Sequence, residues 1–67
     1  MRDKEQIIRL FMFDPTPDNR YFMSYEYRKQ SYKADKPILD AMIKEGTVFI
    51  ISKNTKTVVF EYIPKNI

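Results

Sequence analysis

The chain contains no cysteine and no histidine, and only one of its 67 residues is glycine. Without cysteine there are no disulfides, and without either residue type there are no thiolate or imidazole ligands for structural zinc. The thiolate nucleophile and the imidazole proton shuttle are missing for the same reason. The single glycine, Gly46, excludes a glycine-rich phosphate-binding loop. We therefore expect a protein that is not an enzyme and that has no cofactor and no metal site.

Long apolar runs are missing as well. The longest uncharged apolar stretches are LFMF at 10–13 and TVFIIS at 47–52, and both are shorter than a signal peptide or a membrane span requires. A chain without cysteine and without an export signal is compatible with the cytoplasm. We therefore expect a cytoplasmic protein with no membrane contact.

The chain is rich in apolar and aromatic residues. Hydrophobic residues make up 43% of the sequence and aromatic residues 15%, which is too much for an intrinsically disordered segment. With 67 residues we expect a single domain over 1–67, near the lower size limit for folding without disulfides or metals. Its stability must come from an apolar core, from partners, or from both.

Two segments near the C-terminus predict a β-hairpin. TVFIIS (47–52) and TVVFEYI (57–63) are rich in β-branched and aromatic residues, and KNTK lies between them. With a two-residue turn at 54–55, Phe49 opposes Phe60 and Ile51 opposes Val58. Alternation then places Phe49, Ile51, Val58, Phe60 and Tyr62 on the core face, and Val48, Ile50, Val59 and Glu61 on the other face. A four-residue loop with a shifted register is the alternative.

The segment before the hairpin predicts a short amphipathic helix over 36–45. Asp35 is a suitable cap, and Pro37 is tolerated in a first turn, where its missing N–H has no partner in any case. Gly46 can take the left-handed conformation that ends a helix. The apolar side of this helix carries Ile38, Leu39, Met42 and Ile43.

The N-terminal region allows two interpretations. IIRLFMF (7–13) predicts a buried strand, and DPTPDN then turns the chain into a second strand that starts near residue 20. The alternative is a helix over 3–13, because D-K-E-Q fits a capping box. We favour the strand, since the helix would be apolar on almost every side. The predicted fold is α+β with the order ββαββ: an antiparallel four-stranded sheet with one short helix (36–45) on one face.

A single short helix leaves the other face of such a sheet uncovered. That face would carry Val48, Ile50 and Val59, and large exposed apolar patches often mark interaction sites. A domain of this size also gains much of its stability from association. Two alternatives are a helical N-terminal segment that covers this face, and a strongly twisted sheet on which these side chains are simply exposed. We favour contact of these three residues with a partner, and we expect the chain to form a homo-oligomer, most simply a dimer.

The stretch RYFMSYEYRKQSYK (20–33) combines four tyrosines with several basic residues. A nucleic-acid surface needs stacking rings and cations on the same side. Strand alternation separates them instead, because it turns Tyr21, Met23, Tyr25 and Tyr27 toward the core. The exposed tail of the segment is where recognition is expected. The candidate partner-binding residues there are Arg28, Lys29, Tyr32, Lys33 and Lys36.

These patterns favour a small non-enzymatic protein-binding module that acts as an adaptor, regulator or inhibitor of a macromolecular partner. A protein partner is favoured because tyrosine and arginine are enriched at interface hot spots. Phages and mobile elements encode small proteins of this kind, and by this analogy alone the chain could come from such a source. The alternative is a small basic nucleic-acid-binding protein that uses a 28–36 patch. Residues 20–36 hold five basic and two acidic side chains, a difference equal to the whole net charge of +3.

Overall fold

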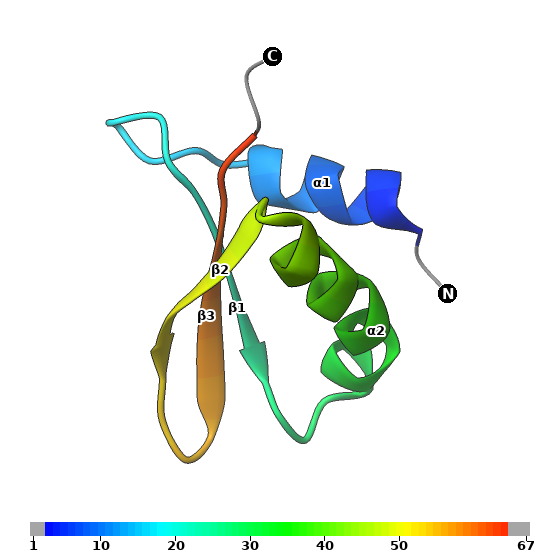
Figure 1. The fold of residues 1–67 in the computed structure, drawn as a ribbon. Coiled ribbons are helices and arrows are strands. Elements are labelled where there is room, and N and C mark those ends of the chain that lie inside the picture. The colour runs from blue at the N-terminus through cyan, green and yellow to red at the C-terminus, as the bar shows by residue number, and fades with distance from the viewer. Residues whose placement is uncertain (1–2, 65–67) are drawn as a thin grey trace.

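The computed structural model describes residues 3–64, whose arrangement is shown in Figure 1. The elements are α1 (Lys4–Met12), β1 (Tyr21–Glu26), α2 (Gln30–Glu45), β2 (Val48–Lys53) and β3 (Thr57–Tyr62). The strands form one antiparallel sheet in the order β1-β3-β2, with β3 in the centre. The α+β class is confirmed for the described residues. The predicted four-stranded sheet with one helix is wrong, because these residues form three strands and two helices.

The segment predicted as a strand over 7–13 belongs to helix α1. The Asp3 side chain accepts a hydrogen bond from the backbone N–H of Gln6, and the Gln6 side chain accepts one from the backbone N–H of Asp3, both at 2.9 Å. This capping box supplies partners to two N–H groups that a helix start otherwise leaves unpaired. The alternative of a helix over 3–13 is therefore correct. The helix buries Ile7 and Phe11, one turn apart, and leaves much of its other apolar surface exposed.

Helix α2 begins at Gln30, well before the predicted start at 36. The predicted cap, Asp35, lies inside the helix and is buried, and its carboxylate accepts a hydrogen bond from the Tyr25 hydroxyl at 2.9 Å. Pro37 is also internal rather than in the first turn. The predicted end is confirmed: Gly46 has φ 88°, in the left-handed region, and its N–H donates to two carbonyls of the last turn.

Strand β2 pairs with β3 in a register that differs from the prediction. The loop between the strands covers residues 54–56, and the register shifts again between Ile50 and Ser52. This β-bulge at Ile51 reverses the faces of the residues before it, because side chains alternate along a strand. Phe49 therefore opposes Glu61 and lies on the face away from the core, whereas the prediction placed it on the core face. Val48 and Ile50, which the prediction placed on the outer face, lie on the same face as the core residues of β3.

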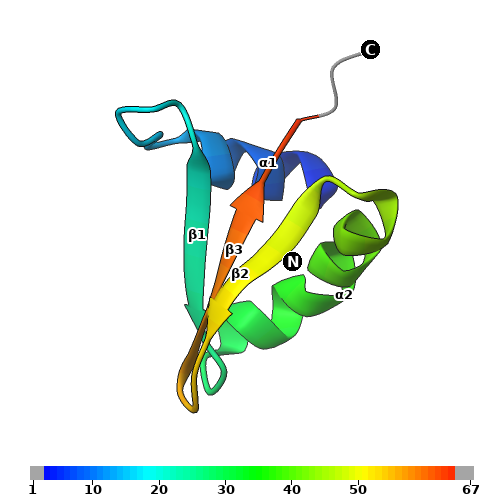
Figure 2. The same cartoon turned by 60° about the vertical axis from the view of Figure 1, so that its left-hand side comes forward.

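Both helices cover the same face of the sheet, so the molecule has one helical layer and one sheet layer (Figures 1 and 2). The core between the layers is built from Ile7, Phe11, Tyr25, Leu39, Met42, Val48, Val58 and Phe60. The predicted strand near 20–27 with tyrosines toward the core is confirmed, since Tyr25 is buried and Tyr21 packs against the core. The other face of the sheet is covered by none of the described elements.

Candidate functional site

The sheet face turned away from the helices is open, as Figure 2 shows. Phe49 on this face is 43% exposed, while Phe22 and Val59 are half-buried. Single exposed apolar side chains are ordinary on a protein surface, but these three come from three different strands and share one surface. Strand pairing places Phe22, Ser24, Glu26, Phe49, Ser52, Thr57, Val59 and Glu61 on this side of the sheet, and the contact with Glu61 adds Arg20. We call the part around the ion pair the open face: Arg20, Phe22, Phe49, Val59 and Glu61.

An ion pair occupies this open face. The Arg20 side chain donates two hydrogen bonds to Glu61, from Nε to Oε2 and from Nη2 to Oε1, both at 2.9 Å. Such bidentate pairs are among the stronger side-chain contacts. The Arg20 guanidinium also lies 4.8 Å from the centre of the Phe22 ring, within the range of a cation–π contact. Glu61 is only 7% exposed, so its neighbours cover most of the residue.

The charges of this pair cancel. Hydrogen bonds from Arg20 are the main reason that the pKa of Glu61 lies below its ordinary value; partial burial opposes the shift, and the positive charge of Arg20 adds to it. The same contact raises the pKa of Arg20. Both groups are therefore ionised at neutral pH. The open face presents apolar side chains around a neutralised pair rather than a net charge.

Strand β2 lies at the edge of the sheet and exposes apolar side chains beside the open face. Phe49, Ile50 and Ile51 are each between 43% and 49% exposed. An apolar edge can pair with a strand of another chain, and proteins resist this with bulges and lysines. Strand β2 has both, a bulge at Ile51 and Lys53 at its end. Its side chains, rather than its backbone edge, are therefore the part suited to contact.

The three apolar residues expected to bind a partner lie in different places. Val48 has no exposed surface and packs in the core, so the expectation that it faces outward is wrong. Ile50 is exposed at the edge, on the helix-covered side of the sheet. Val59 lies on the open face and is half-buried. The outward position of Phe49 was not predicted from the sequence, because the bulge that turns it outward depends on the partner strand.

A second exposed apolar group lies at the end of helix α1. Leu10 and Met12 are partly exposed, and Phe13 is 86% exposed. Leu10 and Phe13 line a shallow pocket of about 280 Å³ together with Gln6 and Arg9. All three apolar residues come from the end of one helix, whereas the open face joins side chains from three strands.

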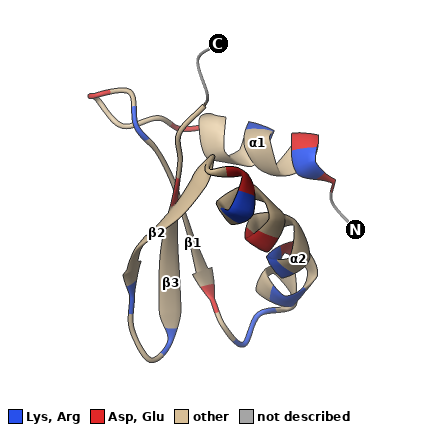
Figure 3. Ribbon diagram, in the orientation of Figure 1, with Lys and Arg blue, Asp and Glu red and all other residues tan. Residues whose placement is uncertain are grey.

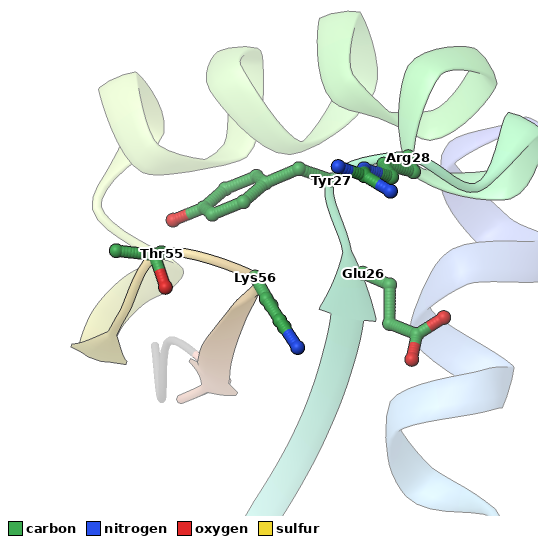
Figure 4. A pocket seen from close by; sticks show the side chains of 5 residues that line it. All are labelled: Glu26, Tyr27, Arg28, Thr55 and Lys56. Atoms are coloured by element: carbon green, nitrogen blue, oxygen red, sulfur yellow. The ribbon is translucent and has the colours of Figure 1, made fainter.

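Basic residues lie both in the connection between β1 and α2 and around the loop between β2 and β3, at the same end of the sheet (Figure 3). The Tyr27 N–H donates to the Lys56 carbonyl at 3.0 Å and holds the two segments together. A pocket of about 250 Å³ lies at this junction, lined by Glu26, Tyr27, Arg28, Thr55 and Lys56 (Figure 4). We call the cluster the basic end: Arg28, Lys29, Lys33, Lys53 and Lys56.

The basic cluster predicted from residues 28–36 is rearranged. Arg28, Lys29 and Lys33 are exposed at the basic end. Tyr32 is half-buried, with ring centres 5.7 Å from Tyr25 and 5.4 Å from Tyr27. It therefore belongs partly to the core.

Lys36 pairs with Asp40 at 2.8 Å, one turn along α2, so it is less available than expected. Hydrogen bonding to Asp40 is the main reason that the pKa of Lys36 is raised. The hairpin lysines Lys53 and Lys56 were missed, because they are distant in sequence from the 28–36 segment.

Within residues 3–64, no three acidic side chains lie close enough together to hold a metal ion. Over the same range, neither helix combines the length and the apolar character needed to cross a bilayer. Comparison with family models, with curated proteins and with solved structures found no match for this chain.

Proposed function

We propose that this chain is a small protein-binding module, and that the open face is its docking surface. The observation that supports the proposal most is the apolar surface of Phe22, Phe49 and Val59, which three strands build around an internally neutralised ion pair. Burying such a surface removes apolar area from water without leaving a charge unpaired. Acting as an adaptor, regulator or inhibitor would then mean occupying the surface of another protein through this face.

The partner that this face fits first is a second copy of the chain. In a symmetric dimer the same patch meets itself, and facing like charges would repel. Arg20 and Glu61 cancel within each copy, so the open face itself carries no net charge. Glu26 is exposed on the same side of the sheet, but it lies at the end beside Lys29. The excess positive charge of the molecule lies at the basic end, outside this face. Two sheets would pack face to face at about 10 Å, with the helices on the outside.

The size of the face sets the expected strength of the dimer. Three strands of six residues cover a footprint of about 14 by 20 Å. This footprint, about 280 Å² per copy, is well below the about 800 Å² per partner of a standard interface, so a complex formed through it alone is weak and transient. We therefore expect a dissociation constant in the micromolar range rather than an obligate dimer.

The test is sedimentation velocity over a concentration series, with two matched variants. Phe49→Ser removes the exposed ring from the open face, and Phe13→Ser removes a more exposed ring from the end of α1. We expect the wild-type chain to dimerise at micromolar concentration. Phe49→Ser should weaken the dimer by about 30-fold, the effect of losing a central aromatic anchor worth about 2 kcal/mol. Phe13→Ser should leave the equilibrium unchanged.

Two results would contradict the proposal. One is a wild-type chain that stays monomeric at hundreds of micromolar. The other is a dimer that Phe13→Ser disrupts and Phe49→Ser does not, because the contact would then belong to α1. A different protein that binds the monomer and loses affinity with Phe49→Ser would support protein binding by the open face, but would overturn the second copy as its occupant.

A further inference from the structure

We propose that the basic end binds the phosphate backbone of a nucleic acid duplex. This proposal is separate from the docking function of the open face, because it uses other residues at another place in the molecule. It extends the basic segment at 28–36 with two lysines that only the fold brings to it. Three features of the basic end support it: its charge, its ordered backbone and its lack of exposed rings.

Positive charge is concentrated at the basic end. Arg28, Lys33, Lys53 and Lys56 form no ion pair with a carboxylate in the described part of the chain, and Lys29 has only a loose contact with Glu26 at 3.8 Å. The basic end therefore combines five cationic side chains with one neighbouring exposed carboxylate, that of Glu26. The net charge of the whole chain is only +3, so the basic end carries most of the molecule's attraction for anions.

Hydrogen bonds to backbone N–H groups order the two segments of the basic end. The Lys29 N–H donates to the Glu26 carbonyl at 3.0 Å and closes a turn after β1. In the hairpin loop, the Asn54 side-chain oxygen accepts hydrogen bonds from the N–H groups of Lys56 and Thr57, both at 2.8 Å. A cationic surface on an ordered backbone loses less entropy on binding than one on a flexible loop.

One phosphate can reach cations from both segments. Arg28 follows β1 and Lys56 precedes β3, and both line the pocket of about 250 Å³ shown in Figure 4. Arginine and lysine are the side chains that most often contact nucleic-acid phosphates. Helix α2 also starts here, after Lys29, without a side-chain cap and without an acidic residue in its first turn. Its partial positive charge adds to the potential of the surface.

The rings near the basic end favour a duplex over a single strand. Proteins that bind single strands stack bases on exposed aromatic rings. Here Tyr27 and Tyr32 are half-buried and pack edge to face against each other, 5.4 Å between ring centres. The 27–29 connection and the 54–56 loop carry no exposed large apolar side chain, so an anionic membrane would gain no insertion there. The remaining mode of binding is electrostatic contact with the phosphate backbone of a duplex.

The experiment is fluorescence anisotropy with a labelled DNA duplex of about two helical turns, ~20 bp, in a salt series. If about four phosphates are contacted, affinity should fall by about 150-fold between 50 and 200 mM salt, with a slope near −3.6. The double variant K53Q/K56Q should bind roughly tenfold more weakly at 50 mM salt, and its slope should fall by about 1.8. Circular dichroism of this variant should show the wild-type fold.

The matched control removes the same charge elsewhere. Arg9 on α1 and Lys44 near the end of α2 are exposed and lie outside the basic end, so R9Q/K44Q should keep most of the affinity. Equal loss in both double variants would contradict the proposal, because net charge alone would then explain binding. So would the absence of salt-dependent binding, or tighter binding to a single strand, to polyglutamate or to phosphatidylserine vesicles than to the duplex.

Discussion

The two faces of the sheet use the same three strands but differ in what covers them. On one face Tyr25, Val58 and Phe60 lie under two helices and are buried. On the other, Phe22, Phe49 and Val59 have no cover from the described chain and surround an ion pair. Apolar residues in a strand therefore do not by themselves identify a core. The helices decide which face stabilises the monomer and which face is available to a partner.

The sharpest test of this difference replaces the same residue type on each face. Phe60 is 3% exposed and Phe49 is 43% exposed, on adjacent strands. Phe60→Ala should lower the free energy of unfolding by about 3–5 kcal/mol, as expected for a buried ring. A chain of this size has a total of about 3–10 kcal/mol, so this variant is expected to be partly or wholly unfolded. Phe49→Ala should lower it by less than about 1 kcal/mol.

Urea denaturation followed by circular dichroism measures both variants, at a concentration where the chain is monomeric. If the two substitutions had the same effect, the contrast between the faces would be wrong. A loss for Phe49→Ala that grows with protein concentration would instead support its role in the dimer, because association stabilises the folded state.

A smaller effect is expected from the ion pair on the open face. Arg20 holds the pKa of folded Glu61 below its ordinary value. The pair therefore contributes stability above the unfolded pKa of about 4.3, and this contribution is lost as the pH falls through the lower folded pKa. Arg20→Gln should destabilise the chain at pH 6, and its deficit relative to wild type should shrink toward pH 3.

Arg9→Gln is the control for that substitution, because it removes an exposed pair with Glu5 at 3.2 Å. Exposed ion pairs contribute little, so its denaturation midpoint at pH 6 should change less than that of Arg20→Gln. Thermal melts at a series of pH values compare the three proteins. A deficit for Arg20→Gln that stays constant from pH 6 to pH 3 would show that its contact with Glu61 is not the cause.

Structural features that depend on local signals could be predicted from the sequence. Alternation in β1 turned the tyrosines inward, and Gly46 ended α2 as expected. The strand predicted over 7–13 was wrong because a short apolar run fits both periods, and the capping box at Asp3 and Gln6 was the deciding local signal. The helix was disfavoured because it would be apolar on almost every side. A helix with apolar residues on several sides is tolerated here, because Phe13 remains exposed.

Features that depend on distant partners could not be predicted in this way. The bulge at Ile51 is a property of how β2 pairs with β3, and it alone turns Val48 inward and Phe49 outward. The basic end joins Arg28 to Lys56 through the pairing of β1 with β3. The Arg20–Glu61 pair also spans most of the chain. Each of these features shapes a surface that we propose binds a partner, and each exists only once the sheet has formed.

The most direct test of the open face as a docking surface is an isotope-filtered NMR experiment on a mixture of labelled and unlabelled chains. Contacts between copies should be seen from the Phe22 and Phe49 rings and the Val59 methyl groups. Contacts should be absent for buried side chains such as Leu39. If contacts between copies came instead from Leu10 and Phe13, or if none were seen at millimolar concentration, the open face would not be the docking surface of a dimer.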